Sequence, residues 1–535
     1  MRIDAVISSG VESALADSPT KGDLLPRLKQ WAAQVDWIPV AIIAVAAILR
    51  LLLLGMKPAH FDEGINGWFV DQMMKNGFYR YDPSNYHGPL HFYVLYVFEA
   101  LLGRNIWALR LPVVGVSMVC VWMMFKFEPF VGKNITRFAA AAMAVSPAFV
   151  FYARYSIHEV WLELFTMFFI LGLLGLWRRG TRGYLWYAGM GVTGMILTKE
   201  TYAIHVACAA LAVLVTWITT KIPYIGSRVP NSKPAAQTWS YVDLLMVTVV
   251  GIALILFFYS GTFFNWPGVK GLYLTWEAWL KTGKNGNGHE KVWYYWIKIM
   301  CQSWEVPVLF AIPFTVWVAL RIKNISLRYM AIYSMGTLAA YSIVAYKTPW
   351  CLISIVWPLL FVFGALVLVT PPALRVATYV TLGLMTWASL GYSVYLNYFK
   401  CSSDSEPYVY VQTYNDMFKL TRPLLELAHR DPANYQLIGH LIRSSTYPLP
   451  WVLADFPKVG YYEGGNIPDK TDADFLLVMQ SKIEEVEGKL TGAYYTEPLT
   501  LRQYQDPSKL YLSAKTFASF YPGRSPDFVG KAAKK

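Results

Sequence analysis

Acidic residues stand at two places where an apolar run of the chain begins or ends. Asp62 and Glu63 follow the apolar run 37–55, and Glu159 begins a later run, with His158 immediately before it. A carboxylate can act as a general base towards a hydroxyl group, or it can bind a metal ion. Asp62, Glu63 and Glu159 are therefore the candidate catalytic residues.

Cations occur in short connections close to these acids. Arg154 precedes Glu159 in "FYARYSIHEVW", Lys199 lies beside an acid in "LTKETY", and Lys347 lies in "AYKTPWC". Lysine binds phosphate as a point charge, and arginine binds it through a fork of donors. Cations that stabilise a leaving phosphate, with a carboxylate that activates an acceptor, would suit group transfer from a lipid phosphate.

Each of these residues also has a structural explanation when it is taken alone. Asp62 could cap a helix that begins near Gly64, because Asp is a favoured N-cap residue. Lys199 and Lys347 could extend to the membrane interface, and the arginine could simply pair with the acid that follows it. The placement of all these groups on one side of a membrane favours the functional interpretation.

The composition identifies the setting of these groups. The chain has 535 residues, of which 55% are hydrophobic and only 15% are charged, whereas a soluble domain would carry about 25% charged residues. Repeated apolar runs of about 15–20 residues predict a polytopic α-helical membrane protein. The net charge of +13 reflects basic residues at the ends of these runs rather than a nucleic-acid surface. The five scattered cysteines predict neither a metal site nor a disulfide framework.

Eleven apolar runs are candidate membrane spans, and their flanking charges predict the topology. The runs cover 37–55, 106–125, 136–152, 159–177, 184–198, 202–219, 241–260, 303–320, 329–345, 350–370 and 376–397. A further apolar segment, 89–103, is interpreted as an interfacial or re-entrant helix, because a crossing there would move every later basic cluster outside. With this assignment the following clusters face the cytoplasm: Lys126/Lys133/Arg137, Arg178/Arg179/Arg182, Lys221/Arg228/Lys233, Arg321/Lys323/Arg328 and Arg375.

The same topology divides the chain into three parts. Residues 1–36 form a cytoplasmic segment without a cleavable signal-peptide pattern, and residues 37–399 form the membrane domain, with the acidic motif in the outer loop 56–105. Residues 400–535 mix strand-like runs such as "DFLLVM" with amphipathic helical segments. The predicted fold class is an all-α polytopic membrane protein with about 11 transmembrane helices and a small C-terminal extracytoplasmic α/β domain. That domain and the candidate acids then lie on the same outer side.

These motifs resemble those of the GT-C superfamily of membrane glycosyltransferases, especially protein O-mannosyltransferases and the lipid A aminoarabinose transferase. The motif "HFDEG" follows the first span in a long outer loop, and "YHGPLHFYV" with His87 leads a short apolar helix before "ALRLP" with Arg110. "SPAFVFYARYSIHEVWLELF" and "GMILTKETY" are similar to the second outer loop and to a segment that ends in lysine. The resemblance covers residues 37–220. "YKTPWCLISIVWPLL" and the C-terminal domain are closer to a flippase-activity-associated, glycosyltransferase-like subfamily.

The resemblance implies an inverting transferase that depends little on metal and uses a polyprenyl-phosphate-linked sugar donor. Asp62, with Glu63, matches the catalytic acid, and Glu159 matches the second acid, which is often Asp in relatives. Arg154 and Lys199 match cations that bind the donor phosphate or organise the site. The substrate-binding candidates, of which the two histidines taken alone favour structural roles, are His87, Arg110, Arg154, His158, Lys199 and Lys347.

The cofactor, partners and location follow from the same resemblance. No cofactor is certain, and whether a divalent metal binds at Asp62 and Glu159 stays open. The expected partners are the polyprenyl-phosphate-linked donor, a protein, lipid or glycan acceptor and the lipid bilayer, without nucleic acid. The expected location is the cytoplasmic (inner) membrane, with the active site facing the periplasm.

One alternative function belongs to a different class. A non-catalytic protein could use the same cations to bind or translocate a lipid-linked glycan. The spans are mostly clean between their ends, whereas a translocator would carry polar groups at mid-membrane depth, so the enzyme is favoured. Nothing in the sequence resembles the sequon-recognising motif of oligosaccharyltransferases, which disfavours that branch.

Overall fold

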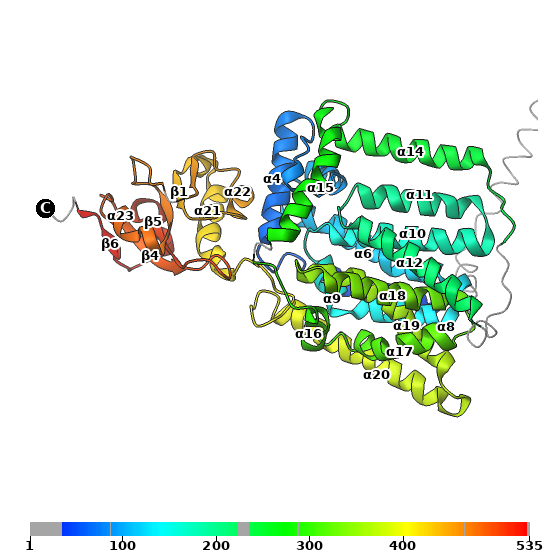
Figure 1. Cartoon of the computed structure of the whole chain (residues 1–535). Helices are drawn as coiled ribbons and strands as arrows, with labels where there is room; N and C mark the ends of the chain where they lie inside the picture. Colours follow the sequence, from blue (N-terminus) through cyan, green and yellow to red (C-terminus); the bar gives the residue numbers. More distant parts are fainter. Residues whose placement is uncertain (1–34, 86, 223–234, 286–287, 465, 532–535) are drawn as a thin grey trace, which may run out of the picture.

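The computed structural model describes residues 35–85, 87–222, 235–285, 288–464 and 466–531. A bundle of helices occupies most of the chain, and a small β-sheet domain follows it (Figure 1). The predicted cytoplasmic segment lies almost wholly outside the described residues, as do Arg228 and Lys233 of one predicted basic cluster. The bundle helices are α3 (Trp37–Leu51), α6 (Ile106–Lys126), α7 (Glu128–Val131), α8 (Lys133–Val145), α9 (Pro147–Ala153), α10 (Glu159–Arg179), α11 (Arg182–Ile196), α12 (Tyr202–Lys221), α14 (Tyr241–Tyr259), α17 (Val306–Arg321), α18 (Ile325–Ile343), α19 (Leu352–Val369) and α20 (Arg375–Val394).

Every predicted apolar run contains a helix, but fewer helices are long and apolar enough to cross a membrane. In the described part of the chain five segments meet this test, namely Ile106–Val131, α10, α12, α14 and Pro349–Val369. Helices α8 and α9 would together make a sixth, but they are bent by 54° where Pro147 starts a new helix after Ser146. The chain is a multi-pass membrane protein, and the prediction of about eleven spans is not confirmed.

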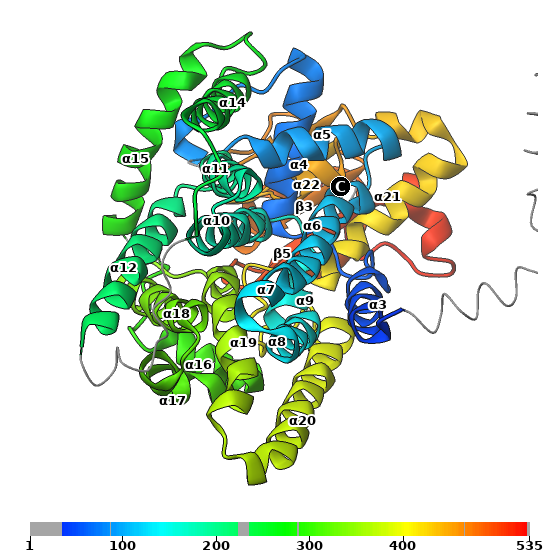
Figure 2. The same cartoon turned by 90° about the vertical axis from the view of Figure 1, so that its right-hand side faces the viewer.

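Helix α19 forms the centre of the bundle, where it packs against α8, α17 and α18. Its sequence, "LISIVWPLLFVFGALVLV", is apolar almost throughout, as expected of a helix that is buried on every side. Figure 2 shows the bundle from the end opposite to the C-terminal domain, with α3, α14 and α20 on its periphery. Most of the buried side chains of the bundle belong to one continuous apolar core.

Four further helices complete the membrane domain: α4 (Phe61–Asn76), α5 (Leu90–Leu102), α15 (Pro267–Asn285) and α16 (Tyr295–Gln302). Helices α4 and α15 lie at the end of the bundle that faces the sheet domain and run across the direction of the bundle helices (Figure 1). Helix α5 coincides with the predicted interfacial segment, and its 13 residues are fewer than the roughly 20 that span a bilayer.

The C-terminal domain contains a six-stranded sheet with strand order β2-β1-β3-β5-β4-β6. Strand β1 pairs in parallel with β2 and β3, whereas β5 pairs antiparallel with β3 and β4, and β6 antiparallel with β4. The strands are β1 (Gly439–Ile442), β2 (Val459–Tyr462), β3 (Phe475–Met479), β4 (Ala493–Leu499), β5 (Ser508–Ser513) and β6 (Phe528–Val529). The helices of this domain are α21 (Phe418–Arg430), α22 (Leu449–Val452), α23 (Ile483–Glu487) and α24 (Ala514–Phe517).

The C-terminal domain packs directly on α4. A Cβ atom on Gly64 would lie 2.4 Å from Cα of Pro448, and one on Gly67 would lie 2.3 Å from Cδ1 of Trp451. These two glycines stand one helical turn apart, so they form a flat face on which α22 lies. Trp451 also donates its indole N–H to Glu99 of α5 over 3.2 Å.

Candidate active site

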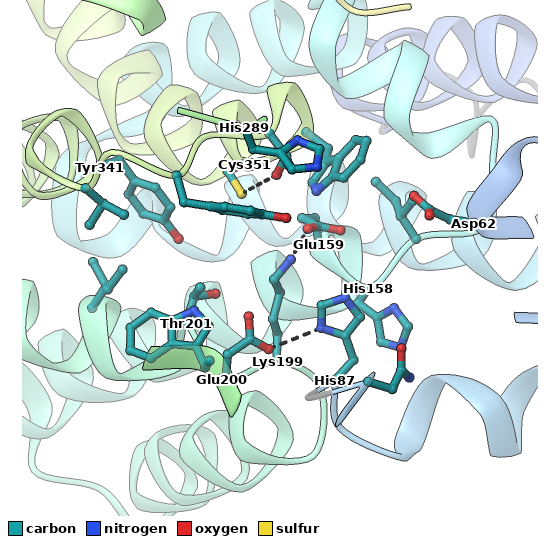
Figure 3. Close-up of a pocket in the computed structure, with 18 of the residues that line it drawn as sticks. Asp62, His87, His158, Glu159, Lys199, Glu200, Thr201, His289, Tyr341 and Cys351 are labelled. Carbon is teal, nitrogen blue, oxygen red and sulfur yellow. Dashed lines mark hydrogen bonds and ion pairs between the residues drawn. The ribbon is translucent and has the colours of Figure 1, made fainter. Parts of the chain in front are cut away.

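A cavity of about 530 Å³ lies where the ends of the bundle helices meet α4 and α15. Its polar lining includes side chains from four separate segments, which the fold brings together: Asp62 and Asn66, His87, His158 and Glu159, and Lys199 and Glu200. Trp279, Leu280, Trp296, Tyr341 and Val344 supply much of its apolar lining. In Figure 3, Asp62 and Tyr341 lie on opposite sides of the cavity, with Lys199 between them.

Asp62 presents a carboxylate to this cavity from the first turn of α4. His60 is the N-cap of α4, and Glu63 completes a capping box with it, so the interpretation of Asp62 as the cap is wrong. The Asp62 side chain is 33% exposed, and its carboxylate lies 3.7 Å from Nδ1 of His60, whose pKa burial lowers. This carboxylate is therefore accessible and is not used to hold the helix.

Glu159 and Lys199 form a buried ion pair in the middle of the cavity wall. Glu159 begins α10, and Lys199 follows α11 in the connection to α12. Burial opposes a charge on Lys199, but Glu159 and Glu200 outweigh it and raise the pKa of Lys199 well above its usual range. Lys199 is the one lysine or arginine among the described residues that line this cavity.

His87 and Glu200 form a second polar pair beside the first. The His87 Nδ1 atom lies 3.1 Å from Glu200 Oε2. Burial raises the pKa of Glu200, but the contact with His87 and the charge of Lys199 lower it overall, so the ionised carboxylate accepts a hydrogen bond from Nδ1–H of His87. A short antiparallel bridge joins His87 to Lys199, and a Cβ on Gly88 would lie 2.2 Å from the carbonyl oxygen of Leu197.

His158 extends the row of imidazoles away from His87. The two ring centroids are 4.6 Å apart, and the buried His91 ring follows at 4.5 Å from His158. Burial, together with the neighbouring histidines and Lys199, lowers the pKa of His158 well below its usual range. His158 is therefore neutral near pH 7, and its ring shapes the cavity wall rather than adding charge.

Glu63 and Arg110 lie outside the cavity, in a fully buried ion pair. Glu63 accepts hydrogen bonds from Arg110, from the Ser156 amide and from the His60 amide, over 2.7–2.9 Å. Burial raises the pKa of Glu63, but Arg110 overcomes this and lowers it to about 2. The remaining donors of Arg110 bind carbonyl groups of the connection between α3 and α4. This pair holds the start of α4 in place.

Arg154 and Lys347 are also absent from the cavity lining among the described residues. Arg154 donates to carbonyls at the end of α3, including Leu52 at 2.8 Å, and its guanidinium lies 4.8 Å from the ring centroid of Tyr398. Lys347 donates to the carbonyls of Lys291 and Val344. Arg154 satisfies carbonyls that the end of α3 leaves open, and Lys347 satisfies one carbonyl at the end of α18 and one in the loop before α16.

Several lining residues were not among the candidates from the sequence. His289 lines the cavity, and its Nδ1 atom lies 2.6 Å from the Tyr410 hydroxyl of the segment that leads to the C-terminal domain. Glu200 was visible only as an acid beside Lys199. Trp350 and Cys351 belong to the "AYKTPWC" motif. In that motif the sequence predicts Lys347 as the binding residue, but Trp350 and Cys351 line the cavity and Lys347 does not, among the described residues.

Several side chains that line the cavity, such as Asp62, Glu159 and Glu200, are of types that can bind a metal ion. No group of three or more His, Cys, Asp or Glu side chains in the described ranges is placed to hold a metal ion. The ion pair with Lys199 also occupies the Glu159 carboxylate. A divalent metal at Asp62 and Glu159 therefore stays a prediction.

Comparison with known proteins agrees with the resemblance found in the sequence. Residues 86–229 match the family described as dolichyl-phosphate-mannose-protein mannosyltransferase. No curated protein matches the chain. The structure of ArnT from Cupriavidus metallidurans bound to undecaprenyl phosphate is similar over 88% of this chain and 97% of that one, with a TM-score of 0.57 and 13% identity. The apo structure of the same protein is similar to the same extent, with 12% identity.

A solved structure of an oligosaccharyltransferase is also similar to this chain. The apo oligosaccharyltransferase of Archaeoglobus fulgidus is similar over 88% of this chain and 75% of that one, with a TM-score of 0.50 and 10% identity. At such identities the likeness concerns the fold. The predicted resemblance to GT-C glycosyltransferases is confirmed by the matched family segment and by this shared fold.

Proposed function

We propose that this chain is a membrane glycosyltransferase that transfers a sugar from a polyprenyl-phosphate-linked donor to a hydroxyl acceptor. The observation that carries the proposal is one cavity that is lined both by the accessible Asp62 carboxylate and by the Glu159–Lys199 pair. ArnT, whose fold is similar, is bound to undecaprenyl phosphate in its structure. That match supports a lipid-phosphate donor here.

The donor's lipid lies at the aromatic side of the cavity, near Trp279 and Tyr341, because apolar side chains gather there. Its phosphate then lies beside Lys199, which holds a positive charge in a buried setting. As the sugar–phosphate bond lengthens, negative charge grows on the phosphate and its attraction to Lys199 increases. The His87–Glu200 pair orients the imidazole towards the same region, where it can donate to a phosphate oxygen when it is protonated.

Asp62 acts as the general base on the opposite side of the cavity. It accepts the proton of the acceptor hydroxyl, whose oxygen attacks the anomeric carbon of the donor sugar. The bond from that carbon to the phosphate oxygen breaks, and the lipid phosphate leaves with the electron pair. Attack from the Asp62 side, opposite to the leaving phosphate, inverts the anomeric configuration. The cavity and the C-terminal domain face the periplasmic side of the cytoplasmic membrane in this proposal.

The substitution Asp62→Asn tests the proposal. Because His60 and Glu63 cap α4, the variant should melt like wild type, while transfer falls by roughly 100-fold or more. The assay measures transfer of labelled sugar from a polyprenyl-phosphate donor to a membrane extract, with binding of polyprenyl phosphate measured on the same preparation. Full transfer by the variant would remove Asp62 from the mechanism.

The same assay distinguishes the alternative function. A protein that only binds or translocates a lipid-linked glycan would bind polyprenyl phosphate in wild type and variant alike, and neither would transfer sugar. Transfer by wild type together with unchanged lipid binding by Asp62→Asn would identify the enzyme.

A further inference from the structure

The carboxyl edge of the C-terminal sheet gathers polar side chains that the proposed reaction does not use. Strands β1 and β3 are parallel neighbours, and the chain leaves them in opposite directions, towards β2 and towards β4. Ligands of open α/β sheets bind outside the carboxyl ends of strands at such a switch point. The pairing register places Met479 of β3, Ser508 of β5 and Leu499 of β4 at the same level of this edge.

Arg443 follows β1 directly and lies at this edge. Its guanidinium donates to the Ser508 hydroxyl and to Gln505 Oε1, the latter over 2.8 Å. The side chain is 1% exposed, and its Nε atom has no hydrogen-bond partner among the described residues. Arg443 is thus a buried cation with neutral acceptors and one donor group left over.

Arg502 follows β4 at the same edge. It donates to the Ser445 hydroxyl over 2.9 Å, and its buried Nη1 atom has no hydrogen-bond partner in the described ranges. Its guanidinium also lies 3.8 Å from the ring centroid of Phe61, which precedes Asp62. Arg502 therefore links the sheet edge to the start of α4.

The two guanidiniums lack the acidic partners that buried arginines usually have. No carboxylate of the described chain lies within 4.0 Å of either guanidinium, whereas Arg110 of the membrane domain pairs with Glu63. Burial lowers the pKa of Arg443 to about 10, with Asp506 opposing it. Burial and Arg443 lower the pKa of Arg502 to about 10, while Asp62 and Glu463 oppose them. Both side chains remain charged near pH 7.

We propose that Arg443 and Arg502 form an anion-binding site at the carboxyl edge of the C-terminal sheet, which takes a carboxylate or phosphate group of the acceptor. An anion would use the two leftover donors, and it would replace the neutral oxygens of Ser508 and Gln505 with charged ones, which are stronger acceptors. The contact of Arg502 with Phe61 places this site next to Asp62. The assignment of the anion to the acceptor rests on the proposed function.

The test measures anion binding by the full chain in phosphatidylcholine nanodiscs, without donor. Sodium phosphate and sodium glucuronate are the probes, and sodium chloride at equal ionic strength is the control. Hydrogen exchange should slow in residues 443–446 and 500–508 with at least one probe and not with chloride. Stronger binding of phosphate indicates a phosphorylated acceptor, and stronger binding of glucuronate indicates an acidic sugar or peptide.

Substitution of the two arginines tests whether the anion binds at the proposed site. R443Q and R502Q should bind the preferred anion at least about tenfold more weakly. R430Q makes the same charge change on the exposed surface of α21, where Arg430 pairs with Glu426, and should bind like wild type. D62N should keep anion binding even though it stops the proposed transfer, so the two proposals can fail separately.

Two results would overturn the site. One is the absence of protection by both probes in wild type, which needs no variant to fold. The other is equal loss of binding in R430Q and in the two buried-arginine variants, which would indicate a non-specific charge effect.

Discussion

Lys199 and Lys347 carry the same charge in similar short connections, and the structure gives them different surroundings. Lys199 lines the cavity beside Glu159, while Lys347 donates to the backbone carbonyls of Lys291 and Val344. Lys199→Met should lower kcat/KM for the donor by about 100-fold. Lys347→Met should leave turnover near wild type, because no substrate group is expected to reach that side chain. A transfer assay over a range of donor concentrations measures both.

A control separates catalysis from stability in the Lys199 variant. Removing Lys199 alone leaves Glu159 as a buried, unpaired charge, which is itself destabilising. The double variant Glu159→Gln/Lys199→Met removes both charges and should regain thermal stability without regaining transfer. If the double variant also regains transfer, Lys199 does not bind the phosphate.

Glu63 predicts a pH dependence of stability. Its folded pKa of about 2 lies below the ordinary value of 4.5, so the ion pair with Arg110 stabilises the fold above pH 4.5 and loses this effect as pH falls towards 2. Glu63→Gln should destabilise the protein by about 3–5 kcal/mol near pH 7. The difference in melting temperature between variant and wild type should narrow between pH 5 and pH 3. A constant difference over that range would contradict the charged pair.

At the residue scale the sequence predicts which side chains share a face, but not which of them open to the cavity. The loop charges place Asp62, Glu159 and Lys199 on one side of the membrane, each near an end of an apolar run, and the three residues line one cavity in the structure. Arg154 satisfied the same criterion, but its donors go to carbonyls at the end of α3. That choice depends on tertiary packing of another helix, which no local pattern in the sequence encodes. His289 gave no signal, because a lone histidine in a polar connection is common.

At the scale of elements, the face formed by Gly64 and Gly67 predicts how α4 and α22 depend on each other. Gly67→Ala should destabilise the contact between them by about 1–3 kcal/mol, because the new methyl would overlap the Trp451 ring. Transfer should fall as well, since α4 carries Asp62. Limited proteolysis of the C-terminal domain and a thermal melt measure the first effect, and the transfer assay measures the second.

A matched glycine substitution controls for helix propensity. Gly115 lies inside α6, and a Cβ there would meet no atom within 4 Å in the described chain. Gly115→Ala should therefore be neutral or stabilise the fold by about 0.5–1 kcal/mol. Equal destabilisation by Gly67→Ala and Gly115→Ala would show that the packing of α22 on Gly67 contributes little to the stability of the fold.

The positions of the helices were predictable from apolar periodicity, whereas their roles as spans were not. Each apolar run contains a helix because its residues must satisfy their backbone groups internally in a lipid environment. The bend at Ser146–Pro147 and the short helix α3 reduce the number of continuous spans. The length of a continuous helix depends on the residue at which the helix ends. A proline or a capping residue sets that end within a few residues.

At the scale of the whole molecule, the basic connection between α10 and α11 lies at the end of the bundle opposite to the cavity. Helix α10 begins at Glu159 in the cavity wall and ends at Arg179, close to Arg182 at the start of α11. Figure 1 shows that this α10–α11 connection lies at the end away from the C-terminal domain. Basic connections favour the cytoplasmic side, so the sheet domain and the cavity should face outwards.

Labelling of introduced cysteines on intact cells tests this orientation. Gly492→Cys lies in the C-terminal domain and Thr181→Cys in the α10–α11 connection, both in a background where the exposed Cys301 is serine. An impermeant thiol reagent should label position 492 on intact cells and position 181 only after permeabilisation, because arginines flank the second site and hold it inside. Labelling of position 181 from outside, with position 492 protected, would show that the orientation of the protein in the membrane is the reverse of the predicted one. The proposed lipid-phosphate reaction would then take place at the cytoplasmic face, although the cavity and its residues would be unchanged.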